Sequence, residues 1–127
     1  MSDLTPKPEA IRALLAAPDD GPVVMLNLLK YKPDGGVESY AEYGRHAVQH
    51  VQAAGGRVLY SGRVENVLVG GESWDAIAVV EYPSRKAFLA MAANPEYQKI
   101  HVHRENGLER TVLIATVPMA LAPGGSR

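Results

Sequence analysis

The chain has 127 residues, no cysteine and a formal net charge of −1, which suits one domain with a single core. Without cysteine there is no disulfide, no thiolate nucleophile and no sulfur-ligated cluster. Lys and Arg are scattered and the N-terminus does not resemble a secretory signal, so we expect a cytoplasmic protein that binds neither nucleic acid nor membrane.

Apolar periodicity and boundary residues predict the elements of secondary structure. In chain order they are helix 8–17, strand 23–31, helix 37–54, a long strand or bent pair at 57–71, strand 74–83, helix 85–93, helix 95–107 and strand 108–117. Ser84 and Asn94 are expected to cap the two later helices, and Gly62 is expected to kink the second strand region. After the first helix the order is βαββαβ, which predicts an α+β, ferredoxin-like sandwich with an antiparallel sheet.

This order divides the chain into three parts. We expect an N-terminal helical extension (1–21), a ferredoxin-like domain (22–117) and a C-terminal tail (118–127). In the first strand both faces are apolar, because one face carries Met25 and Leu29 and the other Leu26 and Leu28. The helices can cover only one sheet face, so a second copy of the sheet is expected on the other, and we predict a homodimer.

The segment EYQKIHVHRE (96–105) contains a His-x-His pair, His101 and His103. On a strand the two imidazoles would share a face, whereas on a helix they point apart. Because this segment is expected to be helical, His103 turns away from His101. The face that carries His101 also carries Tyr97, Ile100 and Arg104.

Two polar residues are expected among apolar neighbours. Asn27 lies in the middle of VVMLNLLKY, so its amide is either satisfied by protein groups or faces a cavity. Arg104 cannot discharge by losing a proton, so it needs a carboxylate, of which Glu81 is the internal candidate, or an anionic ligand.

Weaker candidates lie elsewhere in the chain. His46 and His50 have the i, i+4 spacing of a zinc site, but boundary residues at the edge of an apolar helix face have the same spacing. Arg63 lies beside Gly62, where it either lines the mouth of a cavity or covers a sheet edge.

A turn, a helix and a second turn resemble the family catalogued as domain of unknown function 1330. The matching residues are Tyr82, Pro83, Ser84, Ala87, Asn94, Pro95, Glu96, Tyr97, Gln98 and Arg104. The resemblance spans about residues 22–117 and implies the dimeric α+β barrel superfamily. That superfamily includes cofactor-free monooxygenases, heme-degrading monooxygenases, small isomerases and ligand-binding modules, so the fold does not name a reaction.

A second resemblance concerns the heme-degrading members. Asn27, Tyr82 and His101 lie where those enzymes have an Asn, an aromatic residue and the proximal His, although their aromatic residue is normally Trp. This resemblance implies heme binding with His101 as axial ligand, as an alternative.

The leading hypothesis is a homodimer that binds a small molecule between sheet and helices without a cofactor or metal, as a monooxygenase or isomerase does. His101 would exchange a proton with the substrate and Arg104 would stabilise the oxyanion, with Asn27 and Tyr43 orienting the molecule. The further candidates for substrate binding are His46, Arg63, Tyr82 and Tyr97. A non-catalytic sensor that only holds a metabolite is the other alternative.

Overall fold

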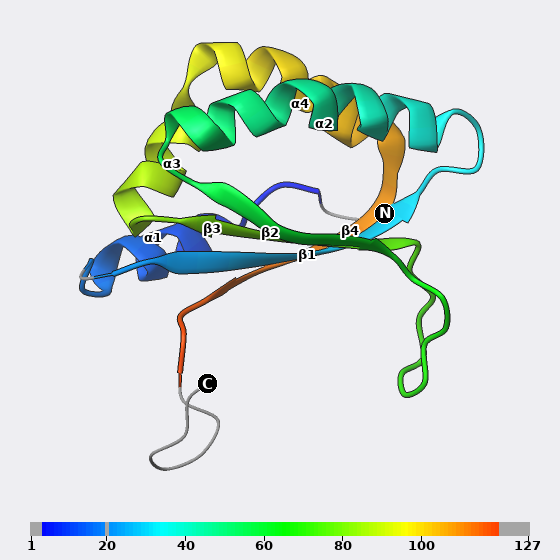
Figure 1. Ribbon diagram of the computed structural model, residues 1–127, viewed down its shortest axis with the longest axis horizontal. Helices are drawn as coiled ribbons and strands as arrows, with labels where there is room; N and C mark the ends of the chain where they lie inside the picture. Colours follow the sequence, from blue (N-terminus) through cyan, green and yellow to red (C-terminus); the bar gives the residue numbers. More distant parts are fainter. Residues whose placement is uncertain (1–3, 20, 120–127) are drawn as a thin grey trace.

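In the computed structural model, which describes residues 4–19 and 21–119, three helices cover one face of a four-stranded sheet (Figure 1). The strands are β1 (Val23–Tyr31), β2 (Arg57–Arg63), β3 (Ala76–Tyr82) and β4 (Leu108–Thr116). The helices are α1 (Pro8–Ala16), α2 (Gly36–Ala53), α3 (Arg85–Ala93) and α4 (Pro95–Gly107). The strand order is β2-β3-β1-β4 and each neighbouring pair is antiparallel, so the predicted α+β, ferredoxin-like fold is confirmed.

Side-chain caps begin the two later helices where the sequence places them. The Ser84 hydroxyl accepts a hydrogen bond from the backbone N–H of Ala87 at 3.0 Å. The Asn94 side chain accepts one from the backbone N–H of Glu96 at 2.8 Å. Each cap satisfies a backbone donor that has no partner within its helix. The cap at Asn94 therefore starts α4 as a separate helix directly after the end of α3.

The second strand region differs from its prediction. Strand β2 ends at Arg63, and residues 64–75 form an irregular loop in which the side chains of Leu68 and Val69 are 87% and 95% exposed. The register shift in β2 falls between Val58 and Tyr60 and not at Gly62. The apolar run in the loop has no neighbouring strand to pair with, and pairing is what stabilises an extended segment.

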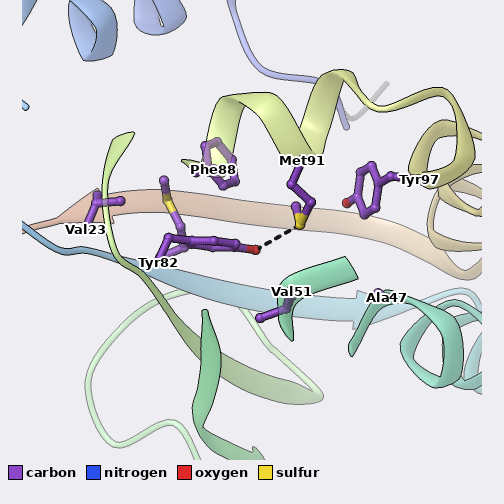
Figure 2. Close-up of a cluster of buried hydrophobic side chains, with 8 residues drawn as sticks. Val23, Ala47, Val51, Tyr82, Phe88, Met91 and Tyr97 are labelled. Carbon is purple, nitrogen blue, oxygen red and sulfur yellow. Dashed lines mark hydrogen bonds between the residues drawn. The ribbon is translucent and has the colours of Figure 1, made fainter. Parts of the chain in front are cut away.

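The core lies between the helices and one face of the sheet. Residues Val23, Met25 and Leu29 of β1 face this side and are almost fully buried. The buried cluster combines the first two with Tyr82 of β3 and with helix residues, and Figure 2 shows most of its members: Val23, Met25, Ala47, Val51, Tyr82, Phe88, Met91 and Tyr97.

The alternate residues of β1 face the opposite side of the sheet, which no described helix covers (Figure 1). Leu26 and Leu28 are only half-buried there, and their cross-strand partners on β3 are Val79 and Ile77. The loop after β2 and the segment after β4 extend on this same side (Figure 1). The described part of the chain therefore leaves one apolar sheet face open.

The end segments are only partly described. Residues 1–3 and 20 of the expected N-terminal extension and residues 120–127 of the expected tail lie outside the described residues. Helix α1 lies next to α3, and the Asp19 carboxylate accepts hydrogen bonds from the backbone N–H groups of Arg85 and Lys86. None of the described helices has the length and apolarity needed to cross a membrane.

Candidate functional site

A cavity of about 900 Å³ lies between the inner sheet face and helices α2, α3 and α4. Residues 4–7 and Ala10 line it from the N-terminal side. This size is typical of small-molecule sites. The side chains that line it from the sheet and the later helices are Met25, Asn27, Tyr40, Tyr43, Ala47, Val48, Val51, Val58, Ser61, Ala78, Val80, Tyr82, Phe88, Met91, Ala92, Tyr97, Gln98, His101, Arg104, Thr111 and Leu113.

Tyrosines of α2 and α4 meet across this cavity. The hydroxyls of Tyr43 and Tyr97 are 2.7 Å apart and share a hydrogen bond. The rings of Tyr40 and Tyr43 have centroids 5.3 Å apart, and those of Tyr43 and Tyr97 6.1 Å. Burial raises the pKa of all three phenols above the ordinary value, so these hydroxyls remain neutral hydrogen-bonding groups.

Arg104 is the buried charged residue of the cavity wall. Its side chain is buried, with the residue only 6% exposed. Its Nη2 donates to Asn27 Oδ1 and to Thr111 Oγ1, each at 3.4 Å. Among residues 4–19 and 21–119, no carboxylate forms an ion pair with it. The guanidinium therefore has neutral partners only.

The predicted internal partner of Arg104 is wrong. Glu81 pairs with Arg57 instead, with Arg57 Nε 3.0 Å from Glu81 Oε1. In the β1–β3 register Glu81 lies opposite Val24, so it belongs to the open side of the sheet. Arg104 lies on the other side, where the side chain of Glu81 cannot reach it.

Asn27 is satisfied by protein groups while it lines the cavity. Its Nδ2 donates to the carbonyl oxygen of Ala78 at 3.2 Å, which leaves its amide oxygen to accept from Arg104. The strand pairing sets the orientation of the amide. Asn27 thus positions the guanidinium from the floor of the cavity.

His101 lies one helical turn before Arg104 on α4 and is half-buried. Its ring centroid lies 5.8 Å from that of Tyr97 and 6.5 Å from that of Tyr43, and its Nδ1 is 3.9 Å from Glu105 Oε2. Burial is the main cause that lowers the pKa of His101, followed by the charge of Arg104, while Glu105 opposes the shift. The imidazole is therefore neutral near pH 7.

The structure brings six of the eight residues predicted for the site to the cavity wall: Asn27, Tyr43, Tyr82, Tyr97, His101 and Arg104. Tyr82 lies at the apolar end, where its hydroxyl donates to Met91 Sδ at 3.7 Å (Figure 2). His46 is not among the lining residues and pairs with Glu42 at 3.0 Å on the exposed side of α2. Arg63 borders a separate hollow of about 870 Å³ and pairs with Glu65 at 3.5 Å.

Sequence reasoning missed Tyr40 and Thr111. Tyr40 stands three residues before Tyr43 on the apolar arc of α2, and this spacing places both on one helix face. Thr111 lies opposite Leu29 in the β1–β4 register and donates to the carbonyl oxygen of Leu28 at 2.8 Å. Alternation along β4 could have placed Thr111 on the inner face, but its contact with Arg104 depends on how α4 packs.

Solved structures with the same fold are numerous, and no functionally curated protein matches the sequence. The RPA0582 protein of Rhodopseudomonas palustris, described as of unknown function, is 34% identical, with a TM-score of 0.85 over 94% of this chain and 98% of that one.

More distant structures show the fold alone. A Bacteroides thetaiotaomicron protein whose description suggests an antibiotic biosynthesis monooxygenase is 18% identical, with a TM-score of 0.58 over 84% of this chain and 95% of that one. A Bacteroides fragilis protein described as dimeric, with a ferredoxin-like fold and unknown function, is 16% identical, with a TM-score of 0.54 over 78% and 98%.

The family model called Domain of unknown function (DUF1330) matches residues 36–117. This range begins with α2 and ends just after β4, so it contains both helices that carry the polar side of the cavity. Together with the likeness to RPA0582, this match shows that the chain belongs to the DUF1330 family.

Proposed function

We propose that the protein binds a small organic molecule in the cavity beneath α2 and α4 and transfers a proton to or from it. The observation that carries the proposal is the pair His101 and Arg104, a neutral imidazole and a buried guanidinium one helical turn apart on the cavity wall. A neutral imidazole can accept a proton, and a fixed positive charge stabilises the oxyanion that results.

In the proposed reaction the imidazole of His101 removes a proton from the carbon next to a carbonyl group. The electron pair moves onto the carbonyl oxygen, and Arg104 stabilises the enolate. Return of the proton to a different atom completes an isomerisation. In a monooxygenase the enolate instead reacts with dioxygen, one oxygen atom entering the substrate and the other leaving as water, with the substrate supplying the electrons.

The Tyr43–Tyr97 hydrogen bond and the Asn27–Arg104 contact support this proposal by limiting motion of the groups that act. Side chains that hydrogen bonds already hold in position need less rearrangement when charge develops on the substrate. The role expected for Asn27 changes in one respect. Its two amide atoms already contact Ala78 and Arg104, so we assign it to positioning Arg104, and Tyr43 to contacting the substrate.

The test is a thermal-shift screen of small aromatic and keto acids, followed by turnover assays of each stabilising compound. His101→Gln should lose turnover, while His103→Gln, which alters an imidazole that does not line the cavity, should keep it. Failure of every compound to bind would overturn the cavity as a ligand site. Binding without consumption would instead make the protein a non-catalytic sensor.

We also propose that the chain forms a homodimer through its open sheet face. Leu26, Leu28, Ile77 and Val79 form an apolar surface there, and the fold of the dimeric Bacteroides fragilis protein supports this arrangement. Light scattering that gives the mass of a monomer at micromolar concentration would overturn it.

The proposed chemistry uses no cofactor. The structure describes a His101 ring packed beside Tyr43 and Tyr97, whose hydroxyls are bonded to each other. We propose this over heme binding because a porphyrin on His101 would compete for space with the Tyr43 and Tyr97 rings that pack beside the imidazole. A hemin titration should therefore show no saturable shift of the Soret band, and a shift that His101→Ala abolishes would contradict this.

A further inference from the structure

The cavity has an uncompensated positive charge. Its described lining residues include Arg104 but no Asp or Glu, and the partners of Arg104 are the neutral side chains of Asn27, Thr111 and Tyr40. Arginine stays charged in proteins, and a buried charge without a counter-charge is costly. A ligand that carries one negative charge would remove this cost. Lys7 also lines the cavity, but it is exposed, so water can solvate its ammonium group.

The hydrogen bonds of Arg104 leave it able to take a stronger acceptor. The bonds to Asn27 and Thr111 both come from Nη2 and measure 3.4 Å, which is longer than the usual range of about 2.7–3.2 Å. A carboxylate forms shorter, charge-assisted bonds with a guanidinium. The planar group also suits an acceptor with two oxygens in one plane.

The rest of the cavity favours an apolar body. Away from Arg104 the wall is formed by aliphatic, aromatic and thioether side chains, namely Met25, Val51, Val80, Phe88 and Met91. Two polar side chains near this region already have partners within the protein: the hydroxyl of Tyr82 donates to Met91 Sδ, and Nε2 of Gln98 donates to the carbonyl oxygen of Ala92. A hydrocarbon or aromatic side chain can be buried here without losing hydrogen bonds to water.

We propose that the ligand is an α-keto acid with a single carboxylate and an apolar, preferably aromatic, side chain. This inference rests on the proposed function and names its substrate class. In an α-keto acid the carboxylate and the keto oxygen are neighbours in one plane, so Arg104 can contact an oxygen of each. His101 then takes a proton from the carbon beyond the keto group, the electron pair moves onto the keto oxygen, and return of the proton to that oxygen gives the enol.

The experiment is isothermal titration calorimetry of the full chain with pyruvate, phenylpyruvate, indolepyruvate and the primary amide of each. The amides keep the shape and remove the charge. We expect phenylpyruvate to bind about 10- to 100-fold more tightly than its amide, the range given by a charge-assisted hydrogen bond. Arg104→Met should abolish the difference. The matched control Arg45→Gln, which removes an exposed cation of α2, should preserve it.

The outcomes separate this inference from the proposed function. Equal affinity for acid and amide, or an acid preference that survives in Arg104→Met, overturns the inference while ligand binding in the cavity stands. Equal affinity for phenylpyruvate and hydrocinnamate, which lacks the keto oxygen, overturns the α-keto assignment. If neither acids nor amides bind, the inference fails, and the broader screen decides the proposed function by itself.

A second readout does not depend on how Arg104→Met folds. In the wild-type protein, a bound anion next to Arg104 offsets the charge that helps to lower the pKa of His101. Proton NMR of the imidazole, assigned with His101→Gln, should therefore show the pKa rising when phenylpyruvate is bound and staying unchanged with the amide. A pKa that both compounds leave unchanged would place the carboxylate away from Arg104 and overturn the inference.

Discussion

Replacing Arg104 with methionine should stabilise the protein in the absence of ligand. The guanidinium is 6% exposed and has no carboxylate partner among the described residues, so folding removes a charge from water without pairing it. Methionine keeps the unbranched shape and an apolar body that fits an irregular wall. Most single substitutions cost about 1 kcal/mol, which makes a gain in stability diagnostic.

The expected change in the free energy of unfolding is the cost of the buried charge that the substitution removes, less the contribution of the hydrogen bonds that it breaks. Two long hydrogen bonds at 3.4 Å disappear, and together they contribute about 1 kcal/mol. An uncompensated buried charge costs about 3–5 kcal/mol. Water that enters the cavity and the hydroxyl of Tyr40, which interacts with Arg104, reduce that cost. We expect a net gain of about 1–2 kcal/mol in the free energy of unfolding.

Urea denaturation at fixed protomer concentration measures this gain, because stability depends on concentration if the protein is a dimer. The midpoint should rise by about 0.5–1 M with an unchanged slope. The control Arg45→Met removes an exposed cation of α2 that pairs with Glu42 and should change stability by less than about 1 kcal/mol. A loss of about 1 kcal/mol or more in Arg104→Met would refute the reasoning, because the guanidinium would then hold the fold together.

Three further predictions test the caps, the open face and the titration of His101. Ser84→Ala should lower the free energy of unfolding by about 1 kcal/mol, because the backbone N–H of Ala87 loses its acceptor; an unchanged urea midpoint would contradict this. Leu26→Lys should convert the proposed dimer to a monomer in light scattering, whereas Val102→Lys, on the exposed side of α4, should not. Because the folded pKa of His101 lies below 6.5, the unfolded chain takes up this proton first as the pH falls below 6.5. Stability should therefore fall with pH more steeply in the wild type than in His101→Gln, and identical pH profiles would show that the shift is absent.

Local signals in the sequence were sufficient for the order and boundaries of most elements. Ser84 and Asn94 begin helices because their side chains satisfy backbone donors within three residues. The continuous apolar run of β1 indicates two apolar faces, of which the described part of the chain buries the one that carries Val23, Met25 and Leu29. The separation of His101 from His103 also follows from local information, because residues two apart on a helix point to different sides.

The partners of the polar residues depended on tertiary structure. Both Glu81 and Arg104 could be assigned to elements from the sequence, but the β1–β3 register turns Glu81 to the open face, where it meets Arg57. His46 differs, because its partner Glu42 lies one turn away on the same helix, and only its position outside the cavity depended on how α2 packs.

Tertiary structure also decided the state of residues 64–71, whose apolar side chains favour a strand that has no partner to pair with. The sequence by itself thus determined the fold and which face of α4 points inward, because periodicity and caps act over a few residues. Strand register and helix packing decided that no carboxylate lies beside Arg104 among the described residues, because they join residues as far apart in the chain as Asn27 and Arg104. The proposed ligand chemistry follows from this absence.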